Sequence, residues 1–105
     1  AVLPADRTHR ALAPARARLA ARDADLLRAQ IALAEIPART GEEGERAEWM
    51  ARRLESLGLV DVHLDGAGNV VGRRPGAAGV EEAVVLCAHL DTVFPRETPL
   101  LVRRE

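Results

Sequence analysis

The stretch that decides the fold is AVVLCA at residues 83–88, which lies between Glu81-Glu82 and His89-Leu90-Asp91. Six consecutive apolar residues with polar neighbours are typical of a strand that is buried on both faces. We therefore predict that residues 83–88 form the central strand of a sheet, with Cys87 as a small buried side chain within it.

The chain before this run predicts a hairpin. Val60, Val62 and Leu64 alternate with polar residues, as in a half-buried strand, so His63 is expected to face solvent. The turn signal DGAGN at residues 65–69 precedes a short return strand at residues 70–72. Only residues 75–82 separate this strand from the apolar run, too few for a parallel crossover, so the two should be antiparallel if they are adjacent.

Residues 14–36 are rich in Ala, Leu and Arg and predict one long helix or two short ones. Pro14 suits a first helical turn, and Pro37 prevents continuation beyond residue 36. Leu27 and Ile31 share a face, so we expect the half after Asp25 to pack on a core.

A second helix is predicted between Thr40 and Gly58. Thr40 and Glu43 have the spacing of a capping box, in which each side chain bonds the backbone N–H of the other residue. Gly58 suits the left-handed position that follows a helix. The apolar face of this helix is expected to comprise Ala47, Met50, Ala51, Leu54 and Leu57.

Composition limits the classes of function. The 105 residues have room for one modest domain, and fifteen Arg against sixteen acidic residues leave no general basic field for nucleic acid. The single cysteine fits a reducing compartment, so we expect a cytoplasmic protein. We expect no membrane partner, because no apolar stretch approaches the ~20 residues of a membrane span. The Arg-rich residues 1–22 are interpreted as a helix start, with a transit peptide as the alternative.

The chemistry is expected at the end of the apolar run. His89 and Asp91 are two residues apart, so in extended backbone their side chains point the same way. A neutral imidazole can ligate zinc while a carboxylate accepts its other N–H, but this spacing also occurs in purely structural histidines. Glu97 in a loop and the terminal Glu105 are poor substitutes as ligands.

The motif HLDTVFP at residues 89–95, placed after an apolar strand, resembles the first metal-site motif of a zinc metallopeptidase family. That family includes acetylornithine deacetylase, succinyl-diaminopimelate desuccinylase, peptidase T and glutamate carboxypeptidase. The upstream signals agree in order: Ile36-Pro37, TGEEG at residues 40–44, the helix closing at Leu57-Gly58, and AGNV at residues 67–70. The resemblance covers residues 26–105, and four ordered signals are more specific than any one.

The resemblance implies a site. His89 would be a ligand to one of two zinc ions, with cobalt or manganese as alternative metals, and Asp91 would be the catalytic-site carboxylate that orients the imidazole. The family's bridging carboxylate, its paired glutamates, its further ligands and a smaller lid or dimerisation domain come later in the chain. The 105 residues alone are therefore expected to be inactive.

The resemblance also implies an α/β fold: the N-terminal part of an α/β/α metallopeptidase catalytic domain, with two helices and a mixed or antiparallel three-strand portion of its sheet. Residues 1–21 would be an N-terminal lead-in and residues 22–105 the partial catalytic domain. The whole enzyme would hydrolyse amide bonds of a peptide or N-acyl amino acid, as a homodimer where the family's dimerisation domain is present. The alternative is a small non-enzymatic α/β interaction module in which His89 is structural.

Overall fold

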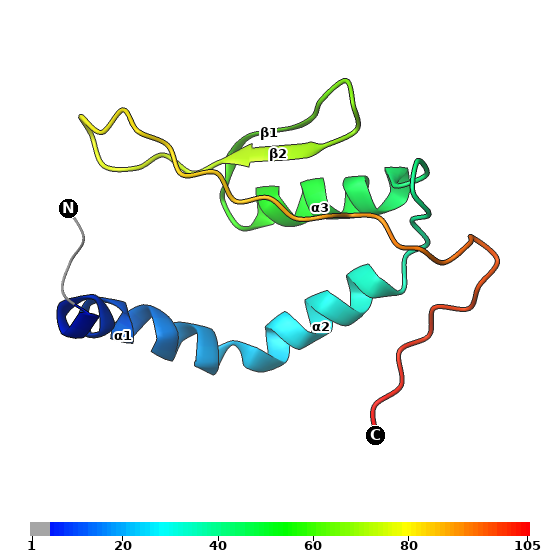
Figure 1. The fold of residues 1–105 in the computed structure, drawn as a ribbon, viewed down its shortest axis with the longest axis horizontal. Helices are drawn as coiled ribbons and strands as arrows, with labels where there is room; N and C mark the ends of the chain where they lie inside the picture. The colour runs from blue at the N-terminus through cyan, green and yellow to red at the C-terminus, as the bar shows by residue number, and fades with distance from the viewer. Residues whose placement is uncertain (1–4) are drawn as a thin grey trace. The chain divides into compact units, whose positions relative to one another are not determined.

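The computed structural model describes residues 5–105, so the first four residues of the predicted lead-in at 1–21 lie outside it. The described chain contains three helices, α1 (Ala5–Ala21), α2 (Asp23–Ala34) and α3 (Gly44–Ser56), and two strands, β1 (Val60–Leu64) and β2 (Val70–Arg73) (Figure 1). It divides into two compact units, residues 1–32 and 33–105. The α/β mixture is confirmed, but the described residues form a two-stranded sheet and not the predicted three-strand portion.

The first unit is helical, and the chain takes the two-helix alternative. The break falls at Arg22, whose N–H donates to the Leu19 carbonyl at 3.1 Å. Pro14 lies inside α1 and not in its first turn, so that prediction is wrong. A proline in the first turn would place the start of the helix just before residue 14. Helix α1 already begins at Ala5, so Pro14 lies in its interior.

The predicted packing of the helix after Asp25 is only partly confirmed. Leu27 and Ile31 are half-buried, but α2 has no fully buried residue and Leu26 is 44% exposed. The helix ends at Ala34, two residues before the predicted limit. Among residues 5–105, no helix has both the length and the apolar content needed to cross a membrane.

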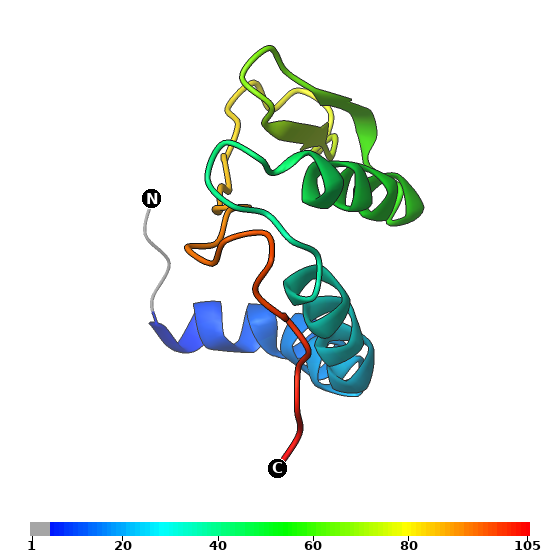
Figure 2. The same ribbon diagram turned by 90° about the vertical axis from the view of Figure 1, so that its right-hand side faces the viewer.

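In the second unit, α3 packs against both strands of the hairpin (Figure 2). Gly58 has φ +83° and follows the helix as predicted. Its N–H donates to the Glu55 carbonyl at 2.9 Å, and the Leu59 N–H reaches back to the Leu54 carbonyl at 3.1 Å. This pair of bonds is the Schellman motif, which satisfies carbonyls that the helix end would otherwise leave open.

Strands β1 and β2 form the predicted antiparallel hairpin, and His63 is exposed as expected. Of the three residues expected on the half-buried face, Val62 is half-buried, but Val60 and Leu64 are exposed, because little of the described chain covers this face. Asp65 organises the turn, because its carboxylate accepts bonds from the N–H groups of Ala67 and Asn69, both at 2.9 Å. The strand pairing shifts between Val60 and His63. The hairpin is therefore a regular ladder with one irregularity near its open end.

The core of this unit is small. Ala38 and Ala47 are its buried apolar residues, and Gly72 lets the sheet lie close to its neighbours. A Cβ on Gly72 would lie 3.2 Å from a methyl of Leu54 and 3.1 Å from one of Leu59. On the predicted apolar face of α3, Ala47 is buried, Met50, Ala51 and Leu54 are half-buried, and Leu57 is exposed.

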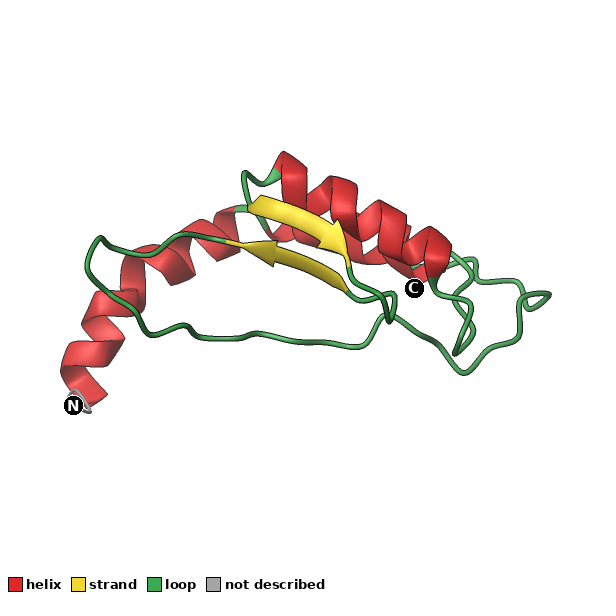
Figure 3. Cartoon of the chain, turned by 90° about the horizontal axis from the view of Figure 1, so that it is seen from above, coloured by secondary structure: helices red, strands yellow, loops and turns green. Residues whose placement is uncertain are grey.

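The prediction of a buried strand at residues 83–88 is wrong for this chain. The segment belongs to no strand and appears as an extended loop in Figure 3. Val84, Val85 and Leu86 are 91%, 82% and 93% exposed, and Cys87 is exposed too. The physical reason is that the described residues offer no partner strand, and an apolar run cannot bury both faces without neighbours.

Candidate functional site

The site begins with the connector between α2 and α3, residues 35–43. The predicted capping box is not formed: the residue at the helix N-cap is Glu43, and no side chain caps the helix. The Glu43 carboxylate instead accepts a bond from the Gly41 N–H at 2.8 Å. The Thr40 hydroxyl is therefore free of the local role that the sequence predicts for it.

Thr40 contacts Asp91. Its hydroxyl donates to Asp91 Oδ2 at 2.7 Å, across 51 positions of the sequence. This bond is the largest cause that holds the pKa of Asp91 below its ordinary value; partial burial opposes the shift, and the nearby His89 adds to it. The carboxylate of Asp91 is therefore kept ionised and is held by one of its two oxygens.

The second oxygen of Asp91 faces His89. Asp91 Oδ1 lies 3.4 Å from His89 Nδ1, so the two predicted site residues do come together. The His89 side chain is 97% exposed, whereas that of Asp91 is 29% exposed. A neutral His89 that carries its proton on Nδ1 faces the carboxylate with that atom and keeps Nε2 open as a ligand.

The backbone beside Asp91 is fixed to the same connector. The Thr92 N–H donates to the Ala38 carbonyl at 2.7 Å, and Arg39 and Thr92 form an isolated parallel bridge. Ala38 is 1% exposed, so the bond lies in the most buried part of this unit. The position of the HLD motif thus depends on the connector and not on a sheet.

Arg46 supplies a further link, and the sequence analysis missed it. Its side chain is nearly buried, at 9% exposed, and it donates three bonds to backbone carbonyls. Nη1 reaches Leu90 at 2.8 Å, Nε reaches Ile36 at 2.8 Å, and Nη2 reaches Ala34 at 3.2 Å. One guanidinium therefore joins the end of α2 to the residue between His89 and Asp91. The sequence does carry a signal for this role: Arg46 lies four residues before Met50, and this spacing places it at the edge of the apolar face of α3.

The His89–Asp91 pair has the chemistry of one part of a metal site. An exposed imidazole with an adjacent ionised carboxylate has the chemistry of one ligand and its orienting partner. Within residues 5–105, no three His, Cys, Asp or Glu side chains are grouped closely enough to hold an ion. Glu97 and Glu105 are exposed and lie outside the pair. The pair fits one side of a zinc site, and a catalytic zinc needs about two further protein ligands.

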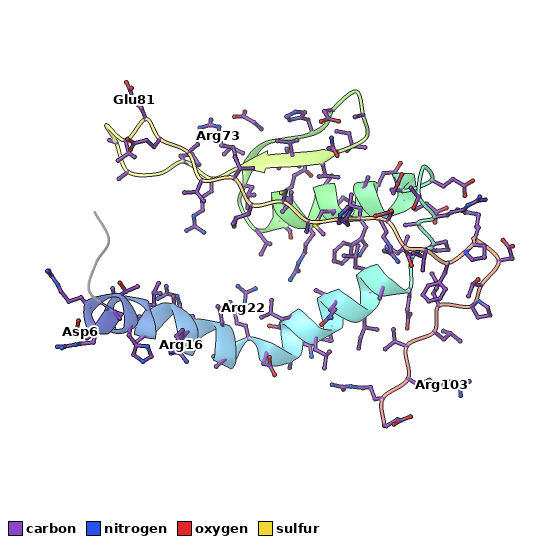
Figure 4. All side chains as sticks on the ribbon, in the orientation of Figure 1. Asp6, Arg16, Arg22, Arg73, Glu81 and Arg103 are labelled. Carbon is purple, nitrogen blue, oxygen red and sulfur yellow. The ribbon has the colours of Figure 1, made fainter. Side chains whose placement is uncertain are left out.

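Other polar side chains belong to elements away from this pair. Ser56 is at the end of α3, where its hydroxyl donates to the Arg53 carbonyl at 2.7 Å. Arg73 and Glu81, both labelled in Figure 4, mark the connection from β2 towards the exposed apolar run. The Arg73 guanidinium pairs with Asp61 at 2.8 Å, so its charge is engaged within the hairpin.

No family model matches the chain. A comparison with curated proteins finds a relative in Pyrococcus abyssi (strain GE5 / Orsay) with the provisional name LysW-lysine/LysW-ornithine hydrolase. The two are 38% identical over 61 residues, which is 58% of this chain and 17% of that protein. The chain thus has partial similarity to a hydrolase and spans about a sixth of its length.

Proposed function

We propose that this chain is the N-terminal part of the catalytic domain of a zinc-dependent hydrolase that cleaves amide or peptide bonds. In this proposal His89 is a metal ligand, and Asp91 is the carboxylate that orients it. The observation that carries the proposal is the pairing of Asp91 Oδ1 with His89 Nδ1 at 3.4 Å, next to an imidazole that is almost fully exposed. Partial similarity to a hydrolase supports the same class.

The roles of the residues follow from their chemistry. Zinc, when bound, supplies Lewis-acid polarisation of a carbonyl and a water of lowered pKa. Asp91 Oδ1 lies 3.4 Å from His89 Nδ1 and is placed to accept a proton from it, which would favour the tautomer whose Nε2 can ligate. The remaining ligands and the general base would come from residues outside this sequence, and so would the strand that pairs with residues 83–88.

The substrate class is an amide of an amino acid. The relative is named as a hydrolase of LysW-lysine and LysW-ornithine. We extend to this chain only the broader class, a peptide or N-acyl amino acid. Two zinc ions, a cytoplasmic location and a homodimer formed through a further domain belong to the same proposal, as does the absence of nucleic-acid and membrane partners.

One observation favours a second candidate, a small non-enzymatic interaction module. Val84, Val85 and Leu86 are each more than four-fifths exposed, and an extended apolar segment of this kind can add to the sheet of another protein. In this case His89 would be structural.

The experiment that separates the two candidates uses protein expressed from the complete reading frame that encodes this sequence. Bound zinc and the hydrolysis of N-acetyl amino acids and dipeptides are measured for the wild type, His89→Ala and His63→Ala. His63 is the matched control, because it is an exposed histidine whose Nδ1 is engaged with the Asp61 carbonyl at 2.7 Å. Loss of zinc and activity in His89→Ala alone supports the hydrolase. Equal zinc content in all three proteins contradicts it.

A further inference from the structure

The connector before α3 holds the carboxylate that faces His89. Asp91 has two oxygens, and each has a different neighbour: Oδ2 accepts the Thr40 hydroxyl at 2.7 Å, and Oδ1 lies 3.4 Å from His89 Nδ1. A carboxylate that is bonded at one oxygen loses rotational freedom about its last side-chain bond. The hydroxyl of Thr40 therefore fixes the direction in which Oδ1 points.

We infer that Thr40 is a positioning residue for the metal ligand His89, acting through Asp91. The inference rests on the proposed function and deepens it by one residue. Thr40 bonds Asp91, and Asp91 is the group that faces His89. Its effect on a metal would pass through the tautomer and the orientation of the imidazole, as for other partners of metal-ligating histidines.

The connector and Arg46 of α3 together hold the backbone around Asp91. Thr92 N–H donates to the Ala38 carbonyl at 2.7 Å, two residues before Thr40, and Arg46 Nη1 donates to the Leu90 carbonyl at 2.8 Å. The backbone on both sides of Asp91 is thus held independently of Thr40, on one side by Ala38 of the connector and on the other by Arg46 of α3. Gly41, with φ +89°, turns the chain directly after Thr40. Removing the hydroxyl should therefore free the carboxylate without displacing the backbone.

The test compares Thr40→Val, which keeps the shape and loses the hydroxyl, with Thr40→Ser, which keeps the hydroxyl. Thr98→Val is the matched control, because Thr98 lies at the tight turn after Pro95, away from Asp91 in sequence, and its backbone N–H bonds the Pro95 carbonyl at 3.0 Å. All variants are made in protein from the complete reading frame, together with His89→Ala. Zinc affinity is measured by competition with a chelating dye, and the His89 tautomer is measured in the zinc-free protein by ¹⁵N NMR.

Thr40→Val is expected to lower zinc affinity by about ten-fold. This is the low end of the range for partners of metal ligands, because Thr40 acts on the ligand through Asp91 and not directly. It should also shift neutral His89 towards the Nε2–H tautomer. Thr40→Ser is expected to restore both values, and Thr98→Val to leave both unchanged. A merely structural role for Thr40 would not move the tautomer of a folded protein.

Three results would overturn the inference. In the first, Thr40→Val keeps wild-type affinity and tautomer while His89→Ala loses zinc; the proposed function then survives and the role of Thr40 does not. In the second, Thr40→Ser behaves like Thr40→Val. The third needs no variant at all: wild-type His89 is found mainly as the Nε2–H tautomer, so that its Nδ1 donates nothing to Asp91. If His89→Ala binds zinc like the wild type, the proposed function itself fails.

Discussion

Arg46→Met removes the guanidinium that joins α3 to the chain around Ala34 and to the HLD motif, and it should strongly destabilise the second unit. Arg46 donates to the carbonyls of Ala34, Ile36 and Leu90, at 3.2, 2.8 and 2.8 Å. Each hydrogen bond to a charged group contributes roughly 1.5–3 kcal/mol, and bonds that share one donor group are not additive. We therefore expect a loss of about 3 kcal/mol, which is a large share of the ~5–15 kcal/mol stability of a typical domain.

Arg46→Lys tests whether the three-bond geometry of the guanidinium matters. A lysine keeps the charge and part of the aliphatic stem, but a single ammonium cannot reach three carbonyls that diverge as these do. Its loss should be roughly half that of Arg46→Met, because about one of the three bonds can be remade. Arg52→Met is the matched control: Arg52 is an exposed arginine on the same helix, and its loss should fall within about 0.5 kcal/mol.

Urea unfolding followed by tryptophan fluorescence measures these differences, since Trp49 is the only tryptophan and lies half-buried on α3. Hydrogen exchange of the Thr92 amide, which donates to the Ala38 carbonyl, reports on the HLD motif itself. A stability of Arg46→Met within 0.5 kcal/mol of the wild type would refute the reasoning, since surface substitutions have effects of about that size. Unchanged protection of Thr92 would refute the link from Arg46 to the motif.

Three further predictions concern single residues. Gly58→Ala should cost about 1–2 kcal/mol in unfolding free energy, because φ at this position is +83° and a Cβ is disfavoured there; no change would contradict the Schellman assignment. Asp65 has its pKa lowered from 3.8, chiefly by its bond to the Asn69 side chain, so it stabilises the turn above that pH and loses this effect as the pH falls through its lower folded value. An NMR titration should show the Asp65 pKa rising in Asn69→Ala. Cys87 is exposed, so a thiol reagent should modify the 105-residue chain as fast when native as in urea, and strong native protection would show that the run is covered.

The sequence predicted those parts of the fold whose causes are local. Gly58 ends α3 as expected, because the left-handed position requires a residue without a Cβ and the two closing bonds lie within five residues of it. The hairpin follows for the same reason: alternation fixes the strands, and Asp65 closes the turn through its own neighbours.

The predictions at residues 83–88 depended on distant neighbours and are wrong for this chain. Apolar character shows that Val85 and Leu86 favour burial, but burial requires other strands, and the described residues supply none for this segment. Cys87 lies in the same segment and is exposed for the same reason. The pairing of His89 with Asp91 was predictable because it needs only a spacing of two residues.

Thr40 shows how magnitudes decide between a local and a distant partner. In a capping box its hydroxyl would accept a neutral backbone N–H, and such a cap contributes about 1 kcal/mol. As a donor to the ionised Asp91 it makes a charge-assisted bond, for which roughly 1.5–3 kcal/mol is typical. A hydroxyl can donate and accept at once, so the two bonds compete only through the placement of Thr40; the structure has the stronger one, and the Gly41 N–H bonds Glu43 instead. A sequence signal of correct type and spacing is thus overridden when the fold brings a charged acceptor within reach, and in this chain that acceptor is the carboxylate that faces His89.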